Sequence, residues 1–151
     1  MTEVSRSPLA HTDLIAVIER VLARYPAEHA IHAQWRYLLT LLEEKTITSH
    51  FVSDGDDYTG VAVIADGLVY DLEFPNAAGT TALSVIRPQT ASSAMFHVGP
   101  MPGLPHGDSA VLSLVLAGAG DDVQAYWMAR TENEVSPLQD FGRILLESSF
   151  V

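Results

Sequence analysis

The hydrophobic periodicity of this chain changes near residue 46. Before that point, apolar side chains recur every three or four residues, as along one face of an α-helix, at Ile31, Trp35, Leu38 and Leu42. After it, they recur every second residue, as along one face of a β-strand, at Leu68, Tyr70, Leu72 and Phe74. Separate blocks of the two periods are typical of an α+β fold, in which helices pack on an antiparallel sheet.

Two helices are predicted in residues 11–45. The first begins at a cap formed by Thr12 or Asp13, and it ends before Pro26 because the residue preceding a proline avoids the α-helical region. The second helix takes Pro26 into its first turn. We expect the two helices to form a hairpin or to pack together against a sheet, and we expect residues 1–10 to be a flexible N-terminus.

About seven antiparallel strands are predicted in residues 46–131. The segments with a strand pattern are 47–53, 58–65, 68–74, 81–87, 92–98, 110–117 and 123–130. Asp66 and Gly67 are the strongest turn signal, because this dipeptide favours the backbone of a two-residue hairpin.

The C-terminal segment returns to helical spacing. A helix is predicted over residues 135–149, with Ser136 as its N-cap and Pro137 at its first position. No internal repeat or linker interrupts the sequence, and 151 residues suit one domain, which we place at residues 11–151. We therefore expect a single α+β domain whose strands form one curved sheet or small barrel, capped by the C-terminal helix.

This order of strands followed by one helix resembles the pleckstrin-homology-like (PH-like) barrel over residues 46–151. The resemblance lies in element order. A phosphoinositide-binding member would need basic residues in its first hairpin, where this chain has Asp-Gly-Asp-Asp at residues 54–57. Two other folds fit: the cone-shaped sheet of NTF2-like proteins, and the helix-flanked sheet of secretion-chaperone-like proteins, which are often small, acidic and dimeric. The latter would need a helix near residues 88–94.

The charge balance argues against several classes of function. The chain carries 19 Asp and Glu against 8 Lys and Arg, for a net charge of -11, and its arginines are scattered. Nucleic acids and anionic membrane surfaces both require clustered basic residues. The absence of cysteine removes disulfides, thiolate zinc sites and cysteine nucleophiles. With no apolar run near ~20 residues and no secretory pattern in residues 1–10, the expected location is cytoplasmic.

The histidines are the first candidates for a site. His29 and His32 lie three residues apart on the second predicted helix, where they can present two imidazoles to one metal ion. The spacing differs from the four-residue separation of the HExxH motif. His50, His97 or His106 would have to supply a third ligand. The alternative interpretation is two surface histidines at the start of a helix.

Acidic residues offer two further candidates. Residues 53–58 gather three carboxylates around a glycine, but they do not follow the EF-hand spacing, so a solvated hairpin turn is the simpler interpretation. Asp71 and Glu73 share the polar face of their strand; they can act as acid and base if that face lines a cavity, and otherwise they face water. No nucleophile elbow or P-loop occurs, so no catalytic residue and no cofactor is assigned.

Large apolar side chains and one long loop supply candidate contacts for a protein partner. The candidate partner-binding residues are Trp35, Leu38, Leu42, Met101 and His106. Trp35 lies on the apolar face of the second predicted helix, which we call the helical seam and which consists of Ile31, Trp35, Leu38 and Leu42. There Trp35 either pins the helix to the sheet or contributes to a dimer contact. The loop of residues 99–108, with three prolines and three glycines, is a lid, a partner-binding loop or an ordinary connection.

Three hypotheses of different classes follow. The leading one is a non-enzymatic cytosolic module that binds a protein or peptide along a sheet edge or between sheet and N-terminal helices, with homodimerisation through the helical seam. The second is a small-molecule-binding protein or enzyme with a pocket inside the curved sheet. Its candidate ligand-binding residues are Tyr70, Phe96, His97 and Trp127. The third is a metal site at His29 and His32.

Overall fold

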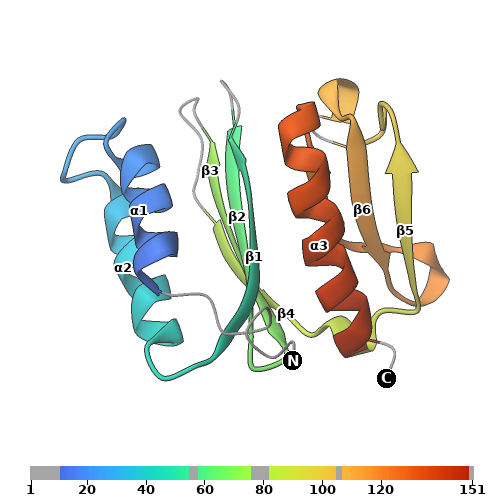
Figure 1. Ribbon diagram of the computed structural model, residues 1–151, viewed down its shortest axis with the longest axis horizontal. Coiled ribbons are helices and arrows are strands. Elements are labelled where there is room, and N and C mark those ends of the chain that lie inside the picture. The colour runs from blue at the N-terminus through green and yellow to red at the C-terminus, as the bar shows by residue number, and fades with distance from the viewer. Residues whose placement is uncertain (1–10, 55–57, 76–81, 105–106, 150–151) are drawn as a thin grey trace. The chain divides into compact units, whose positions relative to one another are not determined.

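The computed structural model describes residues 11–54, 58–75, 82–104 and 107–149, and within them the protein is α+β (Figure 1). The strands form two sheets, one of four strands and one of three, so the prediction of one curved sheet or barrel of seven strands is wrong. The break follows β4 (Ala82–Ile86), where Pro88 opens a 3-10 turn. Proline has no N–H to donate to a ladder, so it does not extend a strand into a sheet interior. The chain divides into two compact units, the first ending at Val85 and the second beginning at Ile86.

The first unit contains two helices and the four-stranded sheet. Its elements are α1 (His11–Leu22), α2 (Ala30–Leu42), β1 (Ile47–Asp54), β2 (Tyr58–Ala65), β3 (Leu68–Pro75) and β4. The strands lie in the order β1-β2-β3-β4, and both helices cover the same face of the sheet (Figure 1). The β1–β2 and β2–β3 pairs are antiparallel.

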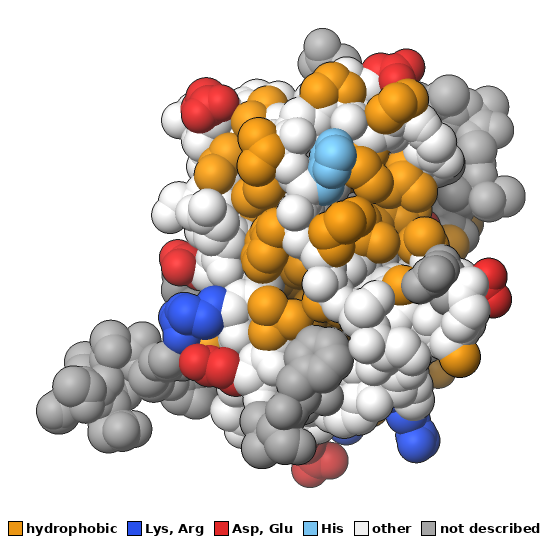
Figure 2. Space-filling model, turned by 90° about the vertical axis from the view of Figure 1, so that its right-hand side faces the viewer, with side chains coloured by type: hydrophobic (Ala, Val, Ile, Leu, Met, Phe, Trp, Pro, Cys, Tyr) orange, Lys and Arg blue, Asp and Glu red, His pale blue; other side chains and the backbone are white. Residues whose placement is uncertain are grey.

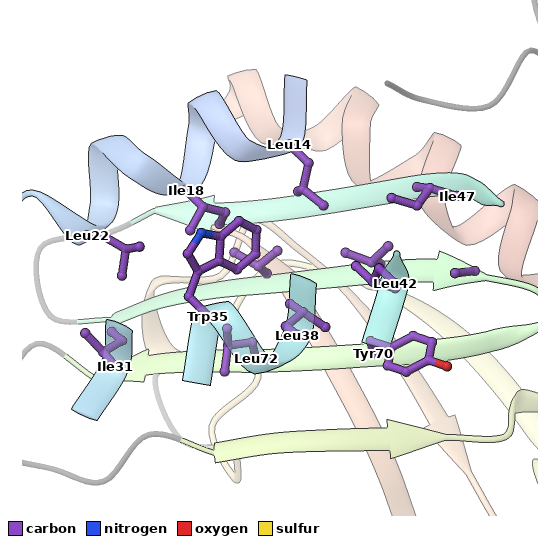
Figure 3. Close-up of a cluster of buried hydrophobic side chains, with 13 residues drawn as sticks. Leu14, Ile18, Leu22, Ile31, Trp35, Leu38, Leu42, Ile47, Tyr70 and Leu72 are labelled. Atoms are coloured by element: carbon purple, nitrogen blue, oxygen red, sulfur yellow. The ribbon is translucent and has the colours of Figure 1, made fainter. Parts of the chain in front are cut away.

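A single apolar cluster forms the core between these helices and their sheet (Figure 3). Its members include Leu14, Ile18, Leu22, Ile31, Trp35, Leu38, Leu42, Val61, Val63, Tyr70 and Leu72. The predicted helical seam is part of this cluster, because its spacing places all four residues on the face of α2 that meets the sheet. On the strands, the alternate residues Val63 and Tyr70 pair across β2 and β3 and point to the same helices.

The predicted hairpin at Asp66 and Gly67 is confirmed. Both residues have positive φ, 50° and 80°, as a two-residue turn of type I′ requires. The Asp66 carboxylate Oδ1 also accepts the backbone N–H of Thr46 at 3.2 Å, and the Asp66 N–H donates to the Thr46 carbonyl at 3.3 Å. The turn is therefore tied to the residue that precedes β1.

The second helix begins later than predicted. Pro26 lies in the preceding turn, and the helix begins at Ala30. His29 is its N-cap: its backbone is extended, and its imidazole Nδ1 accepts the N–H of Ile31 at 3.1 Å. This side chain satisfies one of the N–H groups that a helix leaves unpaired in its first turn.

The second unit contains a three-stranded antiparallel sheet and one helix. Its elements are η2 (Pro88–Thr90), β5 (Ser93–Val98), η3 (Gly107–Ser109), β6 (Leu112–Ala117), η4 (Ala119–Asp121), β7 (Val123–Ala129) and α3 (Glu132–Ser149). The strand order is β5-β6-β7, and α3 packs on β6 and β7. None of the helices in the described ranges combines the length and apolar character that crossing a membrane requires.

The C-terminal helix begins at Glu132, three residues before the predicted start, and Pro137 lies inside it. Glu134 accounts for the earlier start. Its N–H donates to the Thr131 carbonyl at 3.0 Å, and its carboxylate accepts the Arg130 N–H at 2.8 Å. These bonds close the first turn before the proline is reached, so Ser136 is not needed as the cap.

Candidate functional site

The two faces of the second unit's sheet differ in what covers them. Phe96, Leu114 and Trp127 form one cross-strand row, and this row faces α3. Trp127 is buried there, with its ring edge-on to Phe141 at 5.3 Å between centroids. The alternate residues, such as Met95, point to the opposite face. The helix therefore buries one side of β6 and β7 while β5 lies at the margin.

The close approach of β5 to α3 depends on a glycine. A Cβ atom added at Gly142 would collide with Cζ of Phe96 and would lie 3.2 Å from Cδ2 of Leu114. Because Gly142 has no side chain, the Phe96 ring lies against the helix backbone. The ring is still 39% exposed, so it forms part of the surface as well as part of the packing.

An open groove of about 690 Å³ runs between β5 and α3. It is lined by Phe96, Val98 and Leu112 from the sheet and by Gln139, Arg143, Leu146 and Glu147 from the helix. At its edge, Nη1 of Arg143 lies 3.6 Å from Oε2 of Glu147, and both side chains are about half exposed. The groove is therefore apolar along its floor, with a solvated ion pair on its rim.

The strand beside this groove, β5, is unusually apolar for an exposed edge. Met95 is 48% exposed and Val98 is 80% exposed, in addition to Phe96. Figure 2 shows hydrophobic side chains gathered on the side of the molecule where Figure 1 places β5, with charged side chains at the margin. We call this region, comprising β5 and the groove, the β5 surface. An apolar centre with a polar rim is the usual composition of a protein-binding surface.

The four candidate ligand-binding residues do not share one pocket. Tyr70 is buried in the helix-covered core of the first unit. Phe96 and Trp127 lie on the α3 side of the second sheet, whereas His97, the neighbour of Phe96, points to the opposite face and has its Nε2 3.2 Å from the Pro100 carbonyl oxygen. Of the four, only Phe96 lines the groove.

The candidate partner-binding residues also separate. Trp35, Leu38 and Leu42 are 4%, 0% and 0% exposed, and they pack in the core of the first unit, so the helical seam is not an exposed surface. Met101 is half-buried, and its backbone N–H donates to the Gly107 carbonyl at 2.9 Å. His106 lies outside the described residues.

The two candidate metal ligands make local contacts instead. His29 uses Nδ1 to cap α2, and its ring lies 5.0 Å from the ring of Tyr25. Nε2 of His32 lies 3.3 Å from the Tyr25 carbonyl oxygen. In the parts of the chain that the structure describes, no three His, Asp or Glu side chains are grouped to hold a metal ion. Most of the acidic turn at residues 54–57 falls outside those parts.

The acidic pair on β3 belongs to the first unit. Asp71 and Glu73 are half-buried on the face of β3 opposite the helix-covered core, beside Ala62 and Gly60 of β2. Neither residue lines the groove.

Several residues of the β5 surface were not singled out from the sequence. Val98, Leu112, Arg143 and Leu146 all line the groove. The sequence does carry one signal for them: residues 93–98 contain no charged residue and no proline, which is unusual for an edge strand. That signal is meaningful only once the strand is known to be an edge.

No family model, no curated protein and no solved structure matches this chain, and the similarity in element order to the PH-like barrel has no structural counterpart.

Proposed function

We propose that this protein is a non-enzymatic cytosolic interaction module that binds a segment of another protein through the β5 surface. The observation that carries the proposal is the exposure of Met95, Phe96 and Val98 on one edge strand beside an apolar groove. Contiguous exposed apolar side chains with a polar rim mark interaction sites in soluble proteins.

The groove's polar groups support binding. They are Gln139, Arg143 and Glu147, and the last two form an ion pair with each other. Both charged side chains are about half exposed at the rim, where they can contact a bound chain from solvent. The same pair can align polar groups of a bound chain at the groove rim.

A matched pair of variants tests this proposal. Val98→Lys places a charge on the β5 surface, and Val123→Lys places the same charge on β7, the opposite edge of the same sheet, at a residue that is 49% exposed. We expect proteins that co-purify from the host cytosol with the wild-type chain to be lost with Val98→Lys and retained with Val123→Lys. Circular dichroism checks that both variants fold, and an interaction confirmed with the purified partner completes the test. Identical partner profiles for the two variants would rule out the β5 surface.

The groove also favours a second function, the binding of a small apolar molecule. Its volume falls in the range of about 300–1,000 Å³ that is common for ligand sites. A ligand held there would leave Met95, on the other face of β5, without a role, which is why the protein partner is preferred. Native mass spectrometry of the untagged protein distinguishes the two, because a bound molecule appears as an adduct that Leu146→Trp should remove by filling the groove.

A further inference from the structure

We infer that the partner segment binds as an added β-strand along the free edge of β5, in an extended conformation, with apolar side chains at alternate positions and a net positive charge. This inference rests on the proposed function and adds the mode of binding and the chemistry of the partner. Three independent features of the second unit carry it.

The first feature is the unprotected edge of β5. All six of its residues pair with β6 in a regular antiparallel register, and within the described part of the chain no strand lies on its other side. Edge strands usually carry charges, prolines or bulges that prevent further pairing. Residues 93–98 carry no charge and no proline, and their register contains no shift. Among the described residues, the backbone groups on the outer side of this strand therefore have no strand to pair with.

The second feature is the distribution of apolar side chains over both faces of β5. Phe96 and Val98 point to the α3 side, where the groove lies, and Met95 points to the opposite side. An added strand directs alternate side chains to both faces of the sheet. A docked helix would bury the groove side alone and leave Met95 in water. The two-faced pattern therefore favours strand addition, with one set of side chains lying beside Phe96 and Val98 at the groove.

The third feature is charge. The second unit, residues 86–151, contains 7 acidic residues and 3 arginines, and the whole chain has a net charge of -11. Two copies of this chain repel each other at long range, whereas a basic segment is attracted. At the groove rim Glu147 is paired with Arg143, so the attraction comes from the excess of acidic residues in the unit and not from a single local acceptor. These charges favour a cationic foreign segment over a second copy.

A phage-displayed library of random peptides tests the inference on the full-length protein. Peptides of roughly ten residues are long enough to pair along the whole of β5 at ~3.3 Å per residue. The library is selected in parallel on the wild-type chain, on Val98→Lys and on Val123→Lys. We expect the wild type and Val123→Lys to enrich peptides with apolar residues at every second position and an excess of Lys and Arg, and we expect Val98→Lys to lose this enrichment.

Backbone methylation then separates strand addition from other binding modes. In a strand, alternate N–H groups point to the neighbouring strand, so N-methylation of the selected peptide should weaken binding about tenfold or more at every second residue and hardly at all at the residues between. Equal effects at all positions would overturn strand addition.

The remaining outcomes separate the inference from the proposed function. Enrichment of peptides with helical spacing would overturn strand addition, and enrichment of acidic peptides would overturn the basic partner. Either result still supports the interaction module, provided that Val98→Lys alone loses the enrichment. If the wild-type protein is a dimer and Val98→Lys is a monomer, the inference of a foreign segment is overturned, and the occupant of the β5 edge is a second copy of this chain. Failure to enrich any peptide, or equal enrichment on Val98→Lys, would overturn both.

Discussion

At the start of α2, an imidazole occupies the capping position that Ser, Thr, Asp or Asn usually takes. His29 Nδ1 accepts the Ile31 N–H at 3.1 Å. We expect His29→Ala to lower the free energy of unfolding by about 1 kcal/mol and His29→Asp to preserve it, because an Asp oxygen caps the same N–H. Urea denaturation of the three proteins, with and without added zinc, measures this. A large zinc-dependent stabilisation lost in both variants would instead support the metal site.

Asp66 has two roles at one residue. It adopts a left-handed backbone, with φ of 50°, and its carboxylate accepts the Thr46 N–H. Asp66→Ala should therefore lower the free energy of unfolding by about 1–2 kcal/mol, since it loses the hydrogen bond and places alanine in an unfavourable conformation. Asp66→Asn is the control, because asparagine tolerates this backbone and keeps an acceptor oxygen. Equal losses in both variants, measured by urea denaturation, would contradict this account.

Gly142 and Phe96 are coupled through the space that a Cβ atom would occupy. Alanine is favoured over glycine in a helix by about 1 kcal/mol, but at this position it collides with the Phe96 ring. We expect Gly142→Ala to give little or no gain in the wild type and a gain of about 1 kcal/mol in a Phe96→Ala background. A double-mutant cycle measured by chemical denaturation gives the coupling energy between the two substitutions. Additive changes in the free energy of unfolding would show that the added methyl group does not displace the Phe96 ring.

The same substitution should also affect the β5 surface. If Gly142→Ala displaces the Phe96 ring into the groove, binding of a selected peptide should weaken while the fold is retained. This links packing on one side of β5 to the shape of the groove that α3 and the strand share.

At the scale of elements, α3 contains a residue that destabilises the helix. Pro137 is exposed inside this 18-residue helix, where it cannot donate to the carbonyl of Asn133. Pro137→Ala should raise the free energy of unfolding by about 1–3 kcal/mol, more than the control Ser136→Ala next to it. Thermal or urea denaturation measures both. A loss of stability in Pro137→Ala would show that the proline favours the helix start.

The elements themselves were largely predictable from local sequence patterns. The structure places β2 at Tyr58–Ala65, as predicted, and every other predicted strand is present within one or two residues of its expected ends. Helix starts were less predictable, because α2 and α3 use His29 and Glu134 in their first turns, where capping statistics pointed to Pro26 and Ser136. Capping depends on side-chain geometry that sequence spacing does not specify.

At the scale of the whole molecule, the net charge of -11 should govern how partner binding responds to salt. The screening length falls from about 10 Å at 0.1 M salt to about 3 Å at 1 M. We expect the Kd of a selected basic peptide to rise about tenfold over this range and the Kd of its Lys→Gln counterpart to rise much less. Fluorescence anisotropy measures both peptides. Equal salt dependence would show that long-range charge has no part in recognition.

The amino-acid sequence was sufficient for the features that depend on residues near one another in the chain. The change of periodicity near residue 46 predicted which segments become helices and strands, and Asp66 with Gly67 predicted a hairpin, because propensity, side-chain alternation and turn conformation are local properties. The α+β class follows from these elements. The spacing of the α2 seam also indicates one apolar face that something must cover, but whether the sheet or a second copy covers it was decided by the tertiary structure.

Strand pairing and exposure depended instead on contacts between distant residues. Residues 82–86 and 93–98 have similar strand patterns, and nothing local assigns them to different sheets. Whether a strand is central or at an edge depends on which long-range pairings have the lowest free energy. The β5 surface exists because, within the described part of the chain, Ser93–Val98 pairs with β6 alone. The groove likewise requires α3 to bring Arg143 and Leu146 beside Val98, which precedes them by about 45 positions in the sequence. No periodicity within β5 or within α3 encodes this contact.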